Sequence, residues 1–156
     1  MTEHGIGSYE ELLDRCEAAS ASVAQLKADL RDTGAKVDEL TLKMKHVATY
    51  RQLKPIYDRY KASRDKEKFL RGHESEIILF EAAARECKRL GAVPLPAKAR
   101  MQAEMNELNA RKAVLKADLQ KDQCDERDYA AIQRNVEDFL SSPQPEQERK
   151  KNVDLE

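Results

Sequence analysis

Apolar residues recur in alternating steps of four and three from residue 12 to residue 47. They are Leu12, Cys16, Ala19, Val23, Leu26, Leu30, Thr33, Val37, Leu40, Met44 and Val47, and the residues between them are mostly charged or polar. A seam of this kind over about five heptads predicts a coiled-coil helix. Ser8 and Glu11 form a capping-box pattern, so this first arm should begin near Tyr9. Gly34 costs about 1 kcal/mol relative to alanine, but we still predict one helix.

The seam changes phase after Val47. The same spacing continues one position out of register, at Tyr50, Leu53, Tyr57 and Tyr60. Pro55 lacks a backbone donor, and its ring clashes with the preceding turn of a helix. We therefore expect a break or kink between about Gln52 and Pro55, followed by a short helix over 56–62.

Two further helices are predicted after this break. Residues 74–90 have an apolar face, and Gly91 follows in the position of a C-terminal cap. The prolines in 93–96 indicate an extended linker. A second, weaker seam then runs from about Ala97 to Ser141, at Met101, Met105, Leu108, Leu115, Leu119, Tyr129, Val136 and Leu140. Polar residues occupy the same register at Lys112, Asp122, Glu126 and Gln133.

The two arms have matching lengths, about 60–70 Å each at 1.5 Å per residue. We therefore predict an all-α fold, a long antiparallel coiled-coil hairpin with a small helical tip. Met44 and Val47 should then meet Met101 and Met105, and Leu12 and Cys16 should meet Ile132 and Val136. The alternative is a parallel dimer through the first arm, and a hairpin could itself form a homodimer.

This pattern divides the chain into five segments. The arms span 8–53 and 97–141, and the tip spans 54–96. We expect residues 1–7 to be disordered or added during cloning. Residues 142–156 are rich in Pro, Gln, Glu and Lys, so a disordered tail is expected there.

Composition agrees with long helices. Charged residues make up 37% of the chain and aromatic residues 5%, with no Trp. No apolar run approaches the ~20 residues of a membrane span, so we expect a cytoplasmic protein with no membrane partner.

Positive charge is concentrated in the tip. Residues 54–100 hold twelve Lys or Arg against seven Asp or Glu, whereas the whole chain has a net charge of −1. Basic residues alternate with aromatic ones, a mixture that can neutralise phosphates and stack on bases. The candidate nucleic-acid-binding residues are Arg59, Lys61, Arg64, Lys66, Lys68 and Arg71. The alternative is a solvated charged surface over an aromatic core.

Residues suited to catalysis or to metal binding form no recognisable pattern. The three histidines, His4, His46 and His73, share no ligand spacing with one another or with the three cysteines. The cysteines are odd in number and far apart, so we expect reduced thiols. The glycines are scattered, which gives no phosphate-binding loop. We therefore expect no catalytic residue, no metal site and no cofactor.

Four short motifs resemble the C-terminal region of relaxases, the mobilization nucleases of conjugative and mobilizable elements in Gram-positive bacteria. The motifs are GIGSYEEL at 5–12, KEKFL at 66–70, HESEIIL at 73–79 and GAVPLP at 91–96. The likeness covers about residues 4–141. It implies a helical, charged piece of a longer protein whose N-terminal part nicks DNA at the transfer origin.

The resemblance does not extend to the nicking chemistry. That chemistry needs a tyrosine nucleophile and a histidine cluster that holds a divalent metal, whereas the histidines here are isolated. The resemblance therefore implies a non-catalytic domain that serves the nuclease. Its expected partners are transfer-origin DNA and the accessory or coupling proteins of the conjugation apparatus. The alternative is a free-standing coiled-coil scaffold or dimerisation module unrelated to conjugation.

Overall fold

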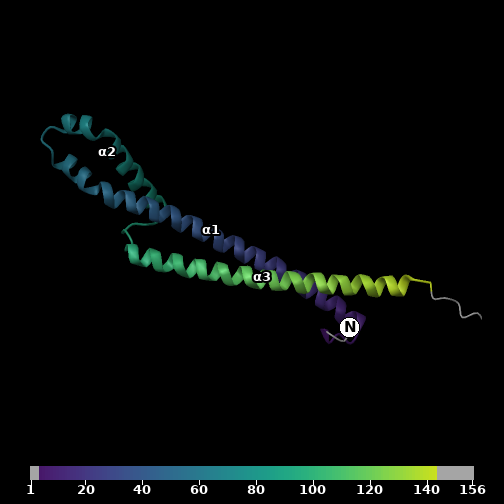
Figure 1. Cartoon of the computed structure of the whole chain (residues 1–156). Coiled ribbons are helices and arrows are strands. Elements are labelled where there is room, and N and C mark those ends of the chain that lie inside the picture. Colours follow the sequence, from purple (N-terminus) through teal and green to yellow (C-terminus); the bar gives the residue numbers. More distant parts are fainter. Residues whose placement is uncertain (1–3, 144–156) are drawn as a thin grey trace, which may run out of the picture. The chain divides into compact units, whose positions relative to one another are not determined.

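The computed structural model describes residues 4–143, which form three α-helices and no strand (Figure 1). Helix α1 spans Tyr9–Ala62, α2 spans Lys66–Arg89 and α3 spans Lys98–Ser141. The predicted all-α fold is therefore confirmed. The contacts divide the described chain into two compact units: unit 1 contains residues 4–24 and 120–143, and unit 2 contains residues 25–119.

In unit 1, the start of α1 is fixed by the residues just before it. Ser8 Oγ accepts a hydrogen bond from the Glu11 amide at 3.1 Å, and a Glu11 carboxylate oxygen accepts one from the Gly7 amide at 2.8 Å. This arrangement confirms the predicted N-terminal cap. Ile6, just before the cap, is only 6% exposed. Residues 1–3 lie outside the described range.

The helices of unit 1 run antiparallel. Tyr9 Oη donates to a Glu137 carboxylate oxygen at 2.8 Å, and Ser20 Oγ donates to Glu126 at 2.8 Å. A residue that lies later in α1 therefore has a hydrogen-bond partner that lies earlier in α3. The seam positions of α1 in this unit, Leu12, Cys16, Ala19 and Val23, are buried or half-buried.

The polar seam positions of α3 have a structural explanation. Asp122 and Glu126 are half-buried and accept hydrogen bonds from Ser22 and Ser20 of α1. A buried or half-buried carboxylate is tolerated when it is hydrogen-bonded. The seam ends before Leu140, which is 67% exposed and therefore not the core residue that we predicted.

Unit 2 has a core to which all three helices contribute. Leu40 and Val47 of α1, Cys87 of α2 and Met101 of α3 are each at most 4% exposed and form one cluster with Ala92. Met44, Met105 and Leu108 pack against it. The predicted meeting of Met44 and Val47 with Met101 and Met105 is thus confirmed.

Helix α1 continues through Pro55, so the helix is not broken where a break or kink was expected. The phase shift of the seam has a different cause, namely a change of packing partner. Tyr50 and Tyr57 pack on Phe80 of α2, with ring centroids 4.7 Å and 4.3 Å apart. Figure 1 shows α2 lying beside the last part of α1. Favourable packing of these rings offsets the hydrogen bond that Pro55 cannot donate.

Helix α2 begins earlier than the predicted helix over 74–90. Asp65 Oδ1 accepts a hydrogen bond from the Lys68 amide at 3.0 Å and caps the helix. The helix contains one non-helical residue, His73, with φ −136° and ψ 23°. The peptide bond between Val93 and Pro94, in the linker to α3, is cis.

The apolar surface of the helices is limited. Among residues 4–143, none of the helices is both long enough and apolar enough to cross a membrane. The large apolar side chains that remain exposed lie mostly off the seams, at Leu13, Leu42, Ile78, Leu79, Val93, Val114, Phe139 and Leu140.

Candidate nucleic-acid interface

The predicted basic residues come together in one part of unit 2. They lie on the last turns of α1, in the connection at 63–65 and on the first turns of α2, a region that we call the basic turn (residues 57–73). Local hydrogen bonds shape it: the Ser63 amide donates to the Tyr60 carbonyl at 3.2 Å, and Ser63 Oγ donates to the Asp65 carbonyl at 3.1 Å. The connection is therefore short and hydrogen-bonded at both ends.

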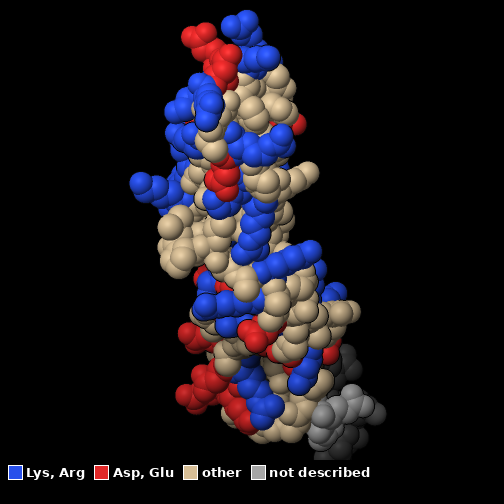
Figure 2. Space-filling view, turned by 90° about the vertical axis from the view of Figure 1, so that its left-hand side faces the viewer, with Lys and Arg blue, Asp and Glu red and all other residues tan. Residues whose placement is uncertain are grey.

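All six predicted nucleic-acid-binding residues are exposed in the basic turn. Arg59 and Lys61 belong to α1, Arg64 lies in the connection, and α2 carries the other three, Lys66, Lys68 and Arg71. Figure 2 looks onto the side where α1 ends and α2 lies, and Lys and Arg gather on the upper part of that face with few Asp or Glu between them.

Few of these positive charges are neutralised within the described residues. Arg71 lies 3.9 Å from Glu67, a long ion pair between side chains that are 81% and 87% exposed. The Lys61 ammonium lies 5.3 Å from the centre of the Tyr57 ring. Among residues 4–143, Arg59, Arg64, Lys66 and Lys68 make no ion pair with Asp or Glu. Their charges are available to an anionic partner.

Two of the cations lie at the end of a helix where cations are least favourable. Lys66 and Lys68 are in the first turn of α2, where the helix dipole favours negative charge by about 0.3–1 kcal/mol per group. Glu67 lies in the same turn and Asp65 caps it, so negative charge is also present at this helix end.

The aromatic residues of the basic turn mainly join α1 to α2. Tyr57 stacks on Phe80, and Tyr60 lies 6.2 Å from Phe69 between ring centroids. Tyr57, Tyr60 and Phe69, the aromatic residues of the basic turn, are all half-buried. Packing between the helices is thus the main role of Tyr57 and Tyr60.

The sequence did not reveal a hollow in the basic turn. Its volume is about 380 Å³, and it is lined by Arg59, Ser63, Asp65, Lys68, Phe69, Gly72 and His73. His73 Nδ1 lies 2.7 Å from a Glu76 carboxylate oxygen, and its ring lies 4.6 Å from that of Phe69. The one sequence signal was Gly72 beside His73, where the regular helix is interrupted. The hollow joins two predicted cations, Arg59 and Lys68, to an aromatic pair.

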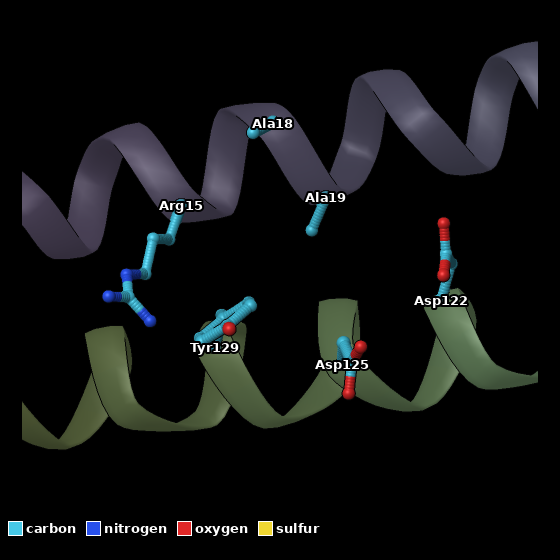
Figure 3. A pocket seen from close by; sticks show the side chains of 6 residues that line it. All are labelled: Arg15, Ala18, Ala19, Asp122, Asp125 and Tyr129. Atoms are coloured by element: carbon cyan, nitrogen blue, oxygen red, sulfur yellow. The ribbon is translucent and has the colours of Figure 1, made fainter. Parts of the chain in front are cut away.

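A second hollow lies in unit 1 and is less suited to a ligand. It measures about 240 Å³ and is lined by Arg15, Ala18, Ala19, Asp122, Asp125 and Tyr129 (Figure 3). The small alanines leave this space between the two helices. Arg15 is already paired with Glu11 at 2.8 Å and donates to the His4 carbonyl at 3.0 Å. Asp122 accepts from Ser22, so two of the three charged groups here have partners within the chain.

The thiols are in three different environments. Cys87 is buried, Cys16 is half-buried and Cys124 is exposed. Burial raises the pKa of the Cys87 and Cys16 thiols, which makes them poor nucleophiles at neutral pH. Within residues 4–143, no three His, Cys, Asp or Glu side chains are grouped so that they could hold a metal ion.

Comparison of the chain with protein-family models, with curated proteins and with solved structures finds no match. No family is therefore assigned, and the resemblance to relaxases stays a prediction. The basic turn is the part of the described chain whose charges and shape point most clearly to a partner.

Proposed function

We propose that this chain is a non-catalytic helical region of a conjugative relaxase and that it contacts DNA through its basic turn. The observation that carries the DNA contact is the group of four exposed cations without an ion pair among the described residues, Arg59, Arg64, Lys66 and Lys68. The relaxase context comes from the resemblance of the four sequence motifs. In this role the chain aids DNA mobilization, and it holds DNA rather than cleaving it.

The proposed contact is mainly electrostatic. Lys and Arg that neutralise phosphates release bound counterions, so the affinity falls as salt rises. Contacts of this type position a protein on nucleic acid without reading the base sequence. The basic turn supplies such contacts from two helices and the connection between them, and the remainder of the chain carries the compensating negative charge.

Fluorescence anisotropy with a labelled DNA oligonucleotide tests this proposal. The chain should bind at ~50 mM salt and lose affinity steeply toward ~200 mM. Replacing Arg59, Arg64, Lys66 and Lys68 by Gln should reduce the slope of log affinity against log salt by roughly 0.9 for each duplex phosphate contact that is lost.

A matched variant controls for net charge. Replacing Arg31, Lys36, Arg111 and Lys116 by Gln removes the same charge from exposed positions outside the basic turn. This variant should keep most of the wild-type affinity. No binding at ~50 mM salt, binding that ignores salt, or an equal loss in the two variants would contradict the proposal.

The relaxase context has a separate test. The genomic reading frame that contains this chain should encode a histidine-cluster nuclease upstream of His4. A reading frame that lacks one would favour a free-standing scaffold, whatever the outcome of the DNA titration.

A protein-interaction role is the second candidate. Phe139 and Leu140 are 74% and 67% exposed at the end of α3, and Leu140 belongs to the predicted seam. An accessory or coupling protein, or a second copy of the chain, could cover these side chains. A stable interface usually buries about 800 Å² on each partner, more than these two residues offer, so we favour the DNA contact.

A further inference from the structure

The hollow in the basic turn combines the two kinds of group that bind a nucleotide. Arg59 of α1 and Lys68 of α2 are exposed cations at its border, and Phe69 and His73 supply aromatic surface. It is a shallow hollow of about 380 Å³ that is largely open to solvent.

The aromatic side of the hollow is held in place from within the chain. The Phe69 ring has two aromatic neighbours, Tyr60 at a centroid distance of 6.2 Å and His73 at 4.6 Å. The His73 ring is fixed in turn by the 2.7 Å contact between its Nδ1 and Glu76. Phe69 and His73 are both only half-buried, so part of the aromatic surface remains open to a ligand.

The polar groups of the hollow leave the cations free. Asp65 is the acidic residue in the lining, and its Oδ1 accepts the capping hydrogen bond from the Lys68 amide at 3.0 Å. Ser63 Oγ donates to the Asp65 carbonyl at 3.1 Å. Neither group forms an ion pair with Arg59 or the Lys68 ammonium among the described residues.

We propose that this hollow holds one unpaired base of a DNA strand, stacked against Phe69, with the flanking phosphates on Arg59 and Lys68. This inference rests on the proposed function and adds to it a preference for single-stranded over duplex DNA. A paired base has both faces covered by its neighbours in the duplex, whereas an unpaired base can present a face to an aromatic ring. The basic turn therefore binds single-stranded DNA more tightly than duplex of the same sequence.

Phe69→Leu separates the contribution of stacking to DNA affinity from the contribution of charge. It removes the aromatic ring but keeps an apolar side chain and changes no charge. One stacked base corresponds to about a 5- to 150-fold change in affinity. Phe69→Leu should therefore weaken binding of a single-stranded oligonucleotide by at least about fivefold and leave binding of the annealed duplex unchanged. Phe69→Tyr keeps the ring and should retain the wild-type preference.

A single 2-aminopurine in the oligonucleotide gives an independent readout. Its fluorescence should change when wild-type protein or the Phe69→Tyr variant binds, and the change should be lost with Phe69→Leu. Thermal unfolding of each variant shows whether the basic turn remains folded, and Phe69→Tyr supplies the ring-containing comparison if Phe69→Leu is unstable.

The outcomes distinguish the two proposals. Salt-dependent binding that is equal for single strand and duplex, and unaffected by Phe69→Leu, overturns the base-binding hollow and leaves the DNA contact standing. Absence of binding to both forms at ~50 mM salt overturns the DNA contact and the hollow together.

Discussion

Gly91 ends α2 in a backbone conformation that other residues adopt only at a cost. Its φ is +68°, its amide donates to the Lys88 carbonyl at 3.3 Å, and the Ala92 amide donates to the Cys87 carbonyl at 2.8 Å. These two bonds form a Schellman motif. Ala92 and Cys87 are each 2% exposed and belong to the core of unit 2, so the cap also fixes where the linker leaves the helix.

We expect Gly91→Ala to destabilise the protein by about 1–2 kcal/mol, the cost of a left-handed conformation for a residue with Cβ. No atom lies within 4 Å of the added Cβ, so the cost is conformational rather than steric. Chemical denaturation, monitored by circular dichroism, should show this loss of stability as a lower denaturant concentration at the unfolding midpoint of the variant.

Gly34→Ala is the matched control for this prediction. Gly34 lies inside α1 with ordinary helical φ, and no atom lies within 4 Å of its added Cβ. The same substitution should therefore stabilise the protein by about 1 kcal/mol. If both variants shifted the midpoint in the same direction, the proposed role of Gly91 would be wrong.

Hydrogen bonds across the helix pair of unit 1 explain why a seam can contain carboxylates. Ser22 Oγ donates to Asp122, which occupies a polar position of the α3 seam. A donor on the opposite helix is needed because a half-buried carboxylate without one loses its hydration and gains nothing in return. The serine and the aspartate therefore act as a pair that favours one register of the two helices.

We expect Ser22→Ala to destabilise the protein by about 1 kcal/mol, since it leaves Asp122 without this donor. The double variant Ser22→Ala/Asp122→Leu should return close to wild-type stability, because both partners are then apolar. Thermal or urea unfolding of the single and double variants gives the coupling between the two residues.

Ser75→Ala controls for helix propensity. Ser75 is exposed in α2 and its substitution should change stability by no more than about 0.5 kcal/mol, in the stabilising direction. A double variant that is less stable than Ser22→Ala alone would contradict the pairing.

The last part of α1 shows how one helix can serve two partners. Up to Val47 its seam packs into the core that α2 and α3 share. Tyr50 packs against this core as well as on Phe80, and Tyr57 stacks on Phe80 of α2. A helix can make this change without ending, because a shift of one position rotates the apolar stripe by about 100°. The phase shift in the sequence therefore marks a new neighbour.

At the scale of the whole molecule, α1 and α3 pair within one chain in each unit. Cross-helix hydrogen bonds show this in unit 1, and the shared core shows it in unit 2. Intrachain pairing was the preferred prediction, and the parallel dimer was its alternative. Each unit thus packs seam residues of the two arms against each other within the chain.

We expect the chain to be a monomer of 17.8 kDa by light scattering under reducing conditions. Its midpoint of thermal unfolding should be independent of protein concentration over about a 100-fold range, as expected when pairing of the arms within one chain supplies the packing. The reductant is needed because Cys124 is exposed.

A larger mass that returns to 17.8 kDa on Leu140→Ser would instead favour self-association through the end of α3. A midpoint that rises with concentration would show that pairing between chains contributes to stability.

The basic turn could be predicted only in part. The six cations were found because charge and local spacing are visible in the sequence. The hollow was missed because its lining comes from residues 59–73 of two helices, and it depends on the interruption at His73. Burial of Tyr57 and Tyr60 could not be separated from base stacking without knowing where α2 lies.

The sequence by itself determined the helical class, two of the caps and the seam of α1, because these depend on interactions between residues a few positions apart. Ser8, Gly91 and the seam of α1 are examples. Tertiary structure decided the continuation through Pro55, the partners of Asp122 and Glu126, and the hollow beside Phe69. Each of these depends on the free energy of packing against a distant segment, which can outweigh a local preference of a few kcal/mol.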